Sequence, residues 1–563
     1  MFIFAQNQRK CAMKKENFIK LYEDSFKNNF DLPALNDYGT QDAFTYGELA
    51  KEIEKLHILF AACQIQQGDK ISVIGKNTTR WCIAYLATVT YGAVIVPILQ
   101  DFNPNDVHHI VNHSESVLLF SSDQIWETLE KTKLPEIKGS LSLTDFRIQY
   151  QKEGVNLQTL TEQLENKFKE KYPNEFRAED IKYADISNDK TVVLNYTSGT
   201  TGFSKGVMIS GNNLSGNMTF AHDYIYLRRS NKMLSFLPLA HTYGAAFEFL
   251  YALSEGCDIT LLGKIPSPKI LLKAFEDIKP SLVIAVPLII EKIYRKTILP
   301  VLEKKTTRFL LKVPGLNSFF YSQIRKKLVD AFGGQFRQVI VGGAPLNREA
   351  EGFLLKIKFP ISVGYGMTEC APLISFSPCP VFVPHSCGKV LDCMEVRIDS
   401  SDPRQIAGEI QTKGQNVMLG YYKNDEATKD VFTEDGWLKT GDLGTIDQNN
   451  NIFIRGRLKS MILGASGQNI YPEEIEAKLE NLPFVSESLV VERAQKLVAL
   501  VYSDHEALKE AGISQSELDT IMEANKENLN NMVAGYEKIS KIELVSSEFE
   551  KTPKKSIKRY LYQ

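Results

Sequence analysis

The residues best suited to chemistry form one stretch rich in glycine and hydroxyl side chains. It runs from Thr197 to Gly206 and reads TSGTTGFSKG. Glycines let the backbone turn tightly and bring its N–H groups near a ligand, while hydroxyls and one lysine attract anionic oxygens. We therefore predict a loop that holds a polyphosphate. Its candidate residues are Thr197, Ser198, Gly199, Thr200, Thr201, Gly202 and Lys205.

The Walker P-loop is the obvious alternative, and the stretch does not fit it. Gly199 and Gly202 are three residues apart, and Lys205 is followed by glycine rather than by serine or threonine. No helical pattern begins at the lysine, so no helix N-terminus would face the phosphates. A hairpin loop without function is the other alternative, and the motifs further along the chain count against it.

Two later motifs place backbone and side chains where a nucleotide could bind. Gly343 and Ala344 follow an apolar run and would let backbone approach a flat ligand. The run GYGMTE at 364–369 brings together an aromatic ring, a hydroxyl and a carboxylate, which suit a base, a phosphate and Mg²⁺. The candidates in this run are Tyr365, Gly366, Thr368 and Glu369.

An aspartate and a histidine add two further candidates. Asp442 lies between Gly441 and Gly444, in a predicted turn that would expose its carboxylate to the two hydroxyls of a ribose. A turn-forming aspartate without function is the alternative. His241 follows a strand that ends in Pro238, which places a titratable ring at a sheet edge. A histidine that only caps a helix in the core fits that pattern equally well.

The bulk composition excludes several classes of function. The chain has 563 residues, 43% hydrophobic and 24% charged, which is typical of a folded protein of several domains. The net charge of −2 gives no basic field, so we expect no nucleic-acid partner. The eight cysteines form no C-x-x-C pair and no zinc spacing, which indicates free thiols in a reducing compartment, the cytoplasm.

The elements that must position these residues follow an α/β pattern. Up to residue 180 helical and strand-like runs alternate, with strands expected at 70–75, 94–98 and 116–120, which favours a mostly parallel sheet. The uncharged run 81–99 approaches the length of a membrane span, but Gly92 and Pro97 divide it into a helix and a buried strand.

Both ends of the chain carry specific expectations. The first residues are too short an apolar run for a secretory signal, and translation is expected to start at Met1 or at Met13, where an amphipathic helix begins. We expect a large domain of layered α/β subdomains with mixed sheets at 1–456. A small, mobile α+β domain is expected at 457–563.

A basic, amphipathic region at 288–330 carries ten lysines and arginines on expected helices. Solvated helical faces are the plain interpretation. The alternative is a surface that meets anionic lipid or an acidic partner. Peripheral contact with the inner face of the membrane and a homodimer stay open as hypotheses.

Taken together, the motifs resemble the adenylate-forming (AMP-binding) superfamily, and within it bacterial long-chain fatty acid–CoA ligases. The resemblance is carried by TSGTTG-x-x-KG at 197–206, GYGMTE at 364–369, W-x-x-TGD at 437–442 and GR-x-K at 456–459. It implies that ATP and Mg²⁺ activate a fatty acid as an acyl-adenylate, and that coenzyme A then takes the acyl group. Two alternatives stay open: transfer to an acyl carrier protein, and a nucleotide-binding protein with weakened adenylation.

The resemblance also implies roles for single residues around the nucleotide. The loop at 197–205 would hold the β- and γ-phosphates, and Thr368 the α-phosphate. Glu369 would bind Mg²⁺ and Tyr365 would stack on adenine. Asp442 and Arg457 would hold the ribose.

Further roles concern the later half-reaction. Lys459 would be the hinge of the small domain. Gly467 and Gln468 would line the thiol side of the site after that domain rotates. His241 remains a catalytic candidate.

One departure from the family pattern affects catalysis. The family places a catalytic lysine between Pro553 and the closing Lys-Arg pair, and here Ser556 occupies that position. We expect Lys555 or Lys554 to take the role through a slip of the chain.

Overall fold

An eight-stranded mixed sheet forms the centre of the computed structural model, which describes residues 17–197, 204–294, 298–304, 307, 316–463, 468–494, 496–552 and 556–562. Its strands, in spatial order, are β20 (Gly420–Tyr421), β9 (Lys205–Ser210), β8 (Thr191–Thr197), β4 (Val94–Ile98), β3 (Lys70–Ile74), β5 (Ser116–Ser121), β6 (Gly139–Ser142) and β7 (Ile148–Gln151). The pairs from β8 across to β6 are parallel, and the outer pairs are antiparallel. The three strands predicted in this region are confirmed, as is the parallel centre of the sheet.

Helices joining these strands begin where the sequence signals them. Thr45 and Glu48 form a capping box at the start of α2, and Gly92 ends α3 with a φ of 90°. The uncharged run is therefore a helix followed by β4, as predicted. Among the described residues, no helix combines the length and apolar character needed to cross a membrane. The helices of this region are α1 (Phe18–Asn28), α2 (Tyr46–Ala62), α3 (Thr79–Tyr91), α4 (Pro104–His113), α5 (Asp123–Trp126), α6 (Leu157–Glu162) and α7 (Leu164–Lys171).

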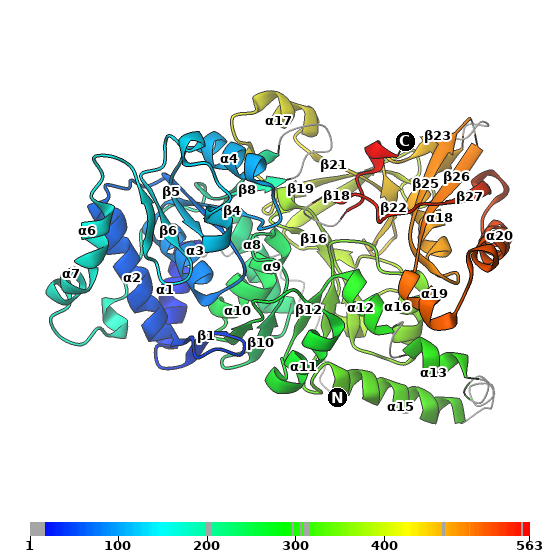
Figure 1. Cartoon of the computed structure of the whole chain (residues 1–563), viewed down its shortest axis with the longest axis horizontal. Helices are drawn as coiled ribbons and strands as arrows, with labels where there is room; N and C mark the ends of the chain where they lie inside the picture. Colours follow the sequence, from blue (N-terminus) through cyan, green and yellow to red (C-terminus); the bar gives the residue numbers. More distant parts are fainter. Residues whose placement is uncertain are drawn as a thin grey trace.

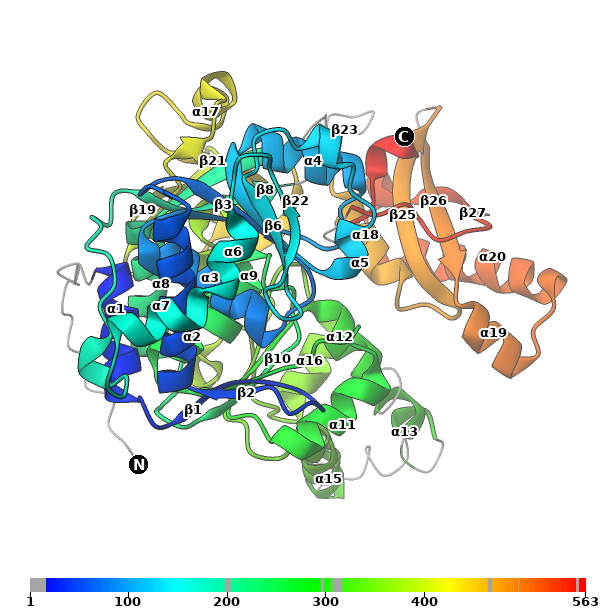
Figure 2. The ribbon, with the colours of Figure 1, turned by 60° about the vertical axis from the view of Figure 1, so that its left-hand side comes forward.

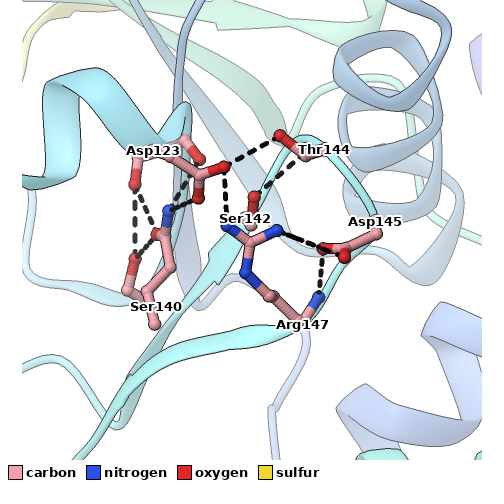
Figure 3. Close-up of polar contacts among 8 residues, drawn as sticks. Asp123, Ser140, Ser142, Thr144, Asp145 and Arg147 are labelled. Atoms are coloured by element: carbon pink, nitrogen blue, oxygen red, sulfur yellow. Dashed lines mark hydrogen bonds and ion pairs between the residues drawn. The ribbon is translucent and has the colours of Figure 1, made fainter.

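A polar cluster fastens the β6–β7 edge of this sheet to α5 (Figure 3). The Asp123 carboxylate accepts hydrogen bonds from Thr144 and Gln149 and pairs with Arg147 at 2.7 Å. Arg147 also pairs with Asp145 at 3.1 Å. The charged groups of this cluster are paired with one another, so its role is to hold the sheet edge to the helix.

Two further sheets lie beside the first (Figure 1). One has the order β10 (Lys232–Ser235), β11 (Asp258–Leu261), β1 (Pro33–Asp37), β2 (Ala43–Thr45), and the other is parallel with the order β12 (Val283–Ala285), β13 (Val339–Val341), β14 (Ile361–Val363). The helices here are α8 (Gly211–Tyr224), α9 (Thr242–Gly244), a π-helix (Ala245–Leu250), α10 (Tyr251–Ser254), α11 (Pro268–Ile278), α12 (Pro287–Ile293), α13 (Leu299–Glu303), α15 (Leu316–Ala331) and α16 (Arg348–Lys356).

Antiparallel strands follow and carry the later motifs. One sheet has the order β15 (Tyr365–Gly366), β16 (Leu373–Phe376), β17 (Lys389–Val390). The next has the order β18 (Met394–Asp399), β19 (Gly408–Gly414), β21 (Leu438–Ile446), β22 (Ile452–Arg457), and α17 (Asp425–Val431) lies in sequence between β20 and β21.

The C-terminal part has its own sheets and its own cores. It contains β23 (Ile462–Leu463) paired with β24 (Asn469–Ile470), the sheet β25 (Val485–Arg493), β26 (Lys496–Ser503), β27 (Ile539–Leu544), and helices α18 (Pro472–Leu479), α19 (His505–Ala511) and α20 (Gln515–Met532). Its buried apolar residues form two clusters, one beginning at Ile470 and the other at Leu489, which are separate from the large cluster that ends at Ile452. Figures 1 and 2 both show α20 and β25–β27 on the side of the molecule opposite α1 and α2.

The two parts touch through polar side chains. Asn347 at the start of α16 donates to Asn481 at 2.6 Å, and Arg348 pairs with Glu474 of α18 at 3.2 Å. The predicted fold class, layered α/β with mixed sheets followed by a small α+β part, is confirmed. The seven described cysteines are free thiols, as expected.

Candidate active site

The glycine-rich stretch joins two antiparallel strands. Thr197 ends β8, Lys205 begins β9, and the two are register partners. Because Lys205 starts a strand and not a helix, the exclusion of the Walker pattern is confirmed. The candidates Ser198, Gly199, Thr200, Thr201 and Gly202 lie outside the described residues.

The ring of Tyr421 joins Lys205 to Glu369. The Lys205 ammonium nitrogen lies 5.0 Å from the centre of the Tyr421 ring. The Tyr421 hydroxyl donates to Glu369 Oε1 at 2.9 Å. Strand β20 brings this tyrosine into place because it pairs with β9, with Tyr421 opposite Val207.

A second group of side chains surrounds Asp442. The Tyr365 hydroxyl donates to Asp442 Oδ2 at 2.8 Å, and Arg457 Nε lies 3.2 Å from Asp442 Oδ1. Burial raises the pKa of Asp442, and the charge of Arg457 and the bond from Tyr365 oppose that rise.

The predicted turn at Asp442 is wrong. Asp442 lies inside β21 and is only 9% exposed. The flanking glycines suggested a turn, but β21 pairs with β19 on one side and with β22 on the other, where Asp442 is opposite Arg457. Gly441, with a φ of 72°, has the backbone conformation that favours glycine, yet the strand continues through it.

The two groups belong to one site. The charge of Glu369 contributes to the raised pKa of Asp442, so the two carboxylates lie within electrostatic reach. Tyr365, from the group around Asp442, and Glu369, from the group around Tyr421, are also only four residues apart in the sequence. Lys205, Glu369 and Asp442 therefore lie in one neighbourhood, because Lys205 and Glu369 contact the same tyrosine and Glu369 acts electrostatically on Asp442.

A cavity lies beside this convergence. Five predicted residues line it: His241, Gly343, Tyr365, Gly366 and Thr368. Its remaining wall is mostly apolar and includes Ile225, Phe247, Ile340, Leu373 and Phe376. The polar end can contact a nucleotide, and the apolar wall can contact a hydrocarbon or an aromatic group.

Two glycines allow backbone to approach this cavity. A Cβ atom on Gly366 would lie 2.1 Å from the carbonyl oxygen of Pro372, so only glycine fits without a shift of the backbone. Gly343 has a φ of 86° and, like Ala344, is exposed just after β13.

The position of His241 fits both interpretations of it, as a residue that caps a helix and as a residue of the site. Its side chain caps α9 by accepting from the Tyr243 amide at 3.4 Å, and the same residue lines the cavity. The buried carboxylate of Glu248 accepts hydrogen bonds from the amides of Phe236 and Leu237, which fixes the segment that leads to the histidine.

Buried asparagine amides position the loop that carries Thr368 and Glu369. Asn217 accepts from the Leu373 amide at 3.1 Å and donates to the Cys370 carbonyl at 3.4 Å. Asn416 donates to the Leu373 carbonyl at 2.8 Å. Sequence reasoning missed these residues and Tyr421, because only pairing between distant segments gives them their roles.

The candidates in the C-terminal part are only partly described. Lys459 is exposed in the segment between β22 and β23, and Gln468 is exposed just before β24. Gly467, Lys554 and Lys555 lie outside the described residues. Ser556, which occupies the position of the family's lysine, is exposed, and its carbonyl accepts a hydrogen bond from the Thr552 amide at 2.8 Å.

Magnesium fits the site through one carboxylate. Glu369 is half-buried, and within the described part of the chain only the Oε1 atom of its carboxylate accepts a hydrogen bond, from Tyr421. Within the described ranges no three histidine, cysteine or acidic side chains gather as a metal cluster. A single carboxylate suits Mg²⁺ that takes its other ligands from phosphates and water.

Comparison with known proteins agrees with this geometry. The family model described as AMP-binding enzyme matches residues 22–422. Long-chain-fatty-acid–CoA ligase FadD15 of Mycobacterium bovis is 29% identical over 92% of this chain and 89% of its own length. 4-Coumarate–CoA ligase CCL1 of Humulus lupulus is 28% identical over 84% of this chain and 82% of its own length.

Solved structures share the fold. ATP-bound MatB from Rhodopseudomonas palustris superposes with a TM-score of 0.74 at 23% identity and covers 96% of this chain and 98% of its own. The anthranilate CoA ligase AuaEII, solved with anthranoyl-AMP, gives a TM-score of 0.77 at 18% identity, over 97% and 96% of the two chains. The chain therefore belongs to the AMP-binding enzyme family, and its similarity over most of its length is to the acid–CoA ligases of that family.

Proposed function

We propose that this protein activates a fatty acid with ATP and then joins it to coenzyme A, releasing AMP and pyrophosphate. The observation that carries the proposal is the convergence of Lys205, Glu369 and Asp442 beside a cavity with an apolar wall. A fatty acid has one anionic end and one apolar chain, and the cavity offers surfaces for both.

In the adenylation step, a carboxylate oxygen of the acid forms a bond to the α-phosphorus of ATP, and the bond to pyrophosphate breaks. Both reactants are anions, so donors and positive charge must screen them. Lys205 and the hydroxyls at 197–201 would contact the β- and γ-phosphates. Thr368, which is 5% exposed and lines the cavity, would donate to the α-phosphate.

The nucleoside would stack its adenine on Tyr365 and place its ribose at Asp442. Tyr365 lines the cavity and its hydroxyl donates to Asp442, so the carboxylate is oriented before ribose arrives. Arg457 is exposed and can contact the same ribose. A Mg²⁺ ion bound at Glu369 would offset the charge of the phosphates.

In the thioester step, the thiol sulfur of coenzyme A forms a bond to the acyl carbon, the bond to AMP breaks, and the thiol proton leaves. We propose that residues 1–456 and 457–563 are two domains and that the second turns about Lys459 between the steps. The separate cores on either side of this boundary and the small polar contact between the parts support this proposal. Gly467 and Gln468 would then line the thiol side.

A fatty acid is proposed over an aromatic acid because several similar proteins bear the name long-chain-fatty-acid–CoA ligase. A panel of C2 to C20 acids and 4-coumarate, assayed by pyrophosphate release with ATP and coenzyme A, tests this choice. We expect the highest kcat/KM between C10 and C18. Highest activity with 4-coumarate or acetate would contradict it. Pyrophosphate release that requires an acid but does not increase when coenzyme A is added would favour an acyl carrier protein as the acceptor.

Peripheral membrane contact is proposed for one surface. On α15, Phe319 is 59% exposed, and Lys326 and Lys327 are exposed. Binding to phosphatidylglycerol vesicles that is lost in the variant F319S/K326E/K327E would support this contact and a location on the inner face of the membrane. Equal binding to neutral vesicles would contradict an electrostatic contribution. A separate proposal is that the protein forms a homodimer, and the molecular mass measured in solution by mass photometry tests it.

A further inference from the structure

Tyr421 lies between the two charged groups that the proposed function assigns to phosphate and metal. Its hydroxyl donates to Glu369 Oε1 at 2.9 Å, and its ring face lies under the Lys205 ammonium at 5.0 Å. Tyr421 itself is only 6% exposed, so the residue is largely shielded from solvent.

The backbone holds this tyrosine firmly. Tyr421 is paired with Val207 of β9, two residues from Lys205, and diagonal neighbours on one face of an antiparallel pair lie within reach of long side chains. The Tyr421 amide donates to Thr428 Oγ1 at 2.9 Å, and the Tyr422 amide donates to the Gly206 carbonyl at 2.8 Å. The ring is therefore placed by the same strand that carries the lysine.

We propose that Tyr421 is a positioning residue for the metal carboxylate and a spacer between that carboxylate and the phosphate-binding lysine. Within the part of the chain that the structure describes, no ion pair joins Lys205 to Glu369. The ring accepts the ammonium on its face and the hydroxyl orients the carboxylate, so each charged group has a partner that leaves it free to meet the nucleotide. The proposal rests on the proposed nucleotide site.

Direct pairing of the two charges would weaken the site. If Lys205 paired with Glu369, phosphate binding would first have to break an ion pair, and the carboxylate would be a poorer metal ligand. Residues that orient a metal ligand by hydrogen bonding typically change metal affinity by about 10- to 100-fold when they are replaced. The hydroxyl and the ring of Tyr421 therefore make separable contributions.

Tyr422 provides a matched control. Tyr422 follows β20 directly, and its hydroxyl donates to a different carboxylate, Glu115, at 2.7 Å. Both tyrosines thus donate to a glutamate, but only Tyr421 does so in the candidate site.

The test measures nucleotide binding without any acid substrate, by calorimetry, as a function of Mg²⁺. For Y421F we expect the Mg²⁺ concentration that gives half-maximal ATP binding to rise about 10-fold. ATP affinity at saturating Mg²⁺ and the affinity for AMP without metal should change less than about twofold, because the ring remains. Y422F should leave all three quantities unchanged.

The larger change Y421L removes the ring as well as the hydroxyl, so comparing it with Y421F separates the effect of the spacer from that of the hydrogen bond. Removing the ring lets the lysine reach the carboxylate, so ATP affinity should fall even at saturating Mg²⁺. Thermal melting of both variants shows whether each is folded, and Y421F alone is sufficient if Y421L does not fold. In the variant E369Q, adding Y421F should cause no further loss of Mg²⁺ affinity, because the two changes remove one interaction.

Two results would overturn the inference. One is an unchanged Mg²⁺ dependence in Y421F, and the other is an equal loss of AMP and Mg²⁺-ATP affinity, which would indicate a structural role only. If the unmodified protein binds neither AMP nor ATP, the proposed function fails as well, so the two failures can be told apart.

Discussion

The Tyr365 hydroxyl and the Asp442 carboxylate are hydrogen-bonded at 2.8 Å, although 77 residues separate them in the chain. This bond joins the motif GYGMTE to the motif W-x-x-TGD. It fixes an acidic group beside the cavity before any ligand binds.

The first prediction concerns this carboxylate. D442N should raise the KM for ATP by roughly 10- to 100-fold, because a hydrogen bond to a charged group is worth about 1.5–3 kcal/mol. The measurement is initial-rate kinetics of pyrophosphate release. The control is D435N, which alters an exposed carboxylate paired with Arg397. Equal KM values for D442N and the unmodified protein would contradict the role of Asp442.

The second prediction concerns the lysines near Ser556. Either K554A or K555A should slow adenylation by about 10²-fold or more, as loss of one donor to a developing charge usually does. Thioester formation from a supplied acyl-adenylate should be unaffected. The control K538A removes an exposed lysine elsewhere in the same part of the chain. If neither single variant slows adenylation, the slip hypothesis is wrong.

The third prediction concerns the C-terminal segment. Arg559 forms a two-pronged pair with Glu476 of α18, and one of its hydrogen bonds is 2.9 Å long. R559A should destabilise the C-terminal part by about 3 kcal/mol, because it leaves a buried carboxylate without its cation. Urea unfolding measures this loss. R493A, which breaks an exposed pair with Glu543, should cost less than about 1 kcal/mol. Equal losses of stability in R559A and R493A would contradict this prediction, because they would show that the Glu476 carboxylate tolerates the loss of its cation.

The fourth prediction concerns stability in acid. The pKa of His57 is lowered from 6.5 to about 4, mainly by burial and in smaller part by the charge of Lys171, while the hydrogen bond with the Ala87 carbonyl opposes the shift. The unfolded chain therefore binds a proton that the folded chain excludes between pH 6.5 and about 4. Stability is complete above pH 6.5 and falls by about 3 kcal/mol as the pH drops to about 4.

Urea unfolding between pH 8 and 4 measures this dependence. H57Q should flatten the slope below pH 6.5, because it removes the titrating ring and keeps a donor for the carbonyl. H222Q, which alters an exposed histidine paired with Glu255, should leave the slope unchanged. The same slope in H57Q as in the unmodified protein would contradict the assignment.

Local sequence signals predicted the elements of this fold well. The glycine that ends α3 and the apolar strands are short-range features, and the structure contains each of them. Five of the residues that the motifs singled out line one cavity.

What the sequence did not predict depends on pairing between distant segments. Asp442 was expected in an exposed turn because its glycine neighbours are local, whereas its burial comes from strands on both sides. Tyr421 belongs to a two-residue strand, and only the pairing with β9 brings it between Lys205 and Glu369. No spacing rule within the chain encodes such a placement.

The most direct test of the account is a single-turnover experiment with ATP, Mg²⁺ and palmitate but no coenzyme A. We expect a burst of pyrophosphate close to one equivalent per active site, with palmitoyl-AMP detected by mass spectrometry, and steady release once coenzyme A is added. D442N should reduce the burst at low ATP. Absence of both products with every acid from C2 to C20, or pyrophosphate release that does not depend on acid, would contradict the claim that these segments form one adenylating site.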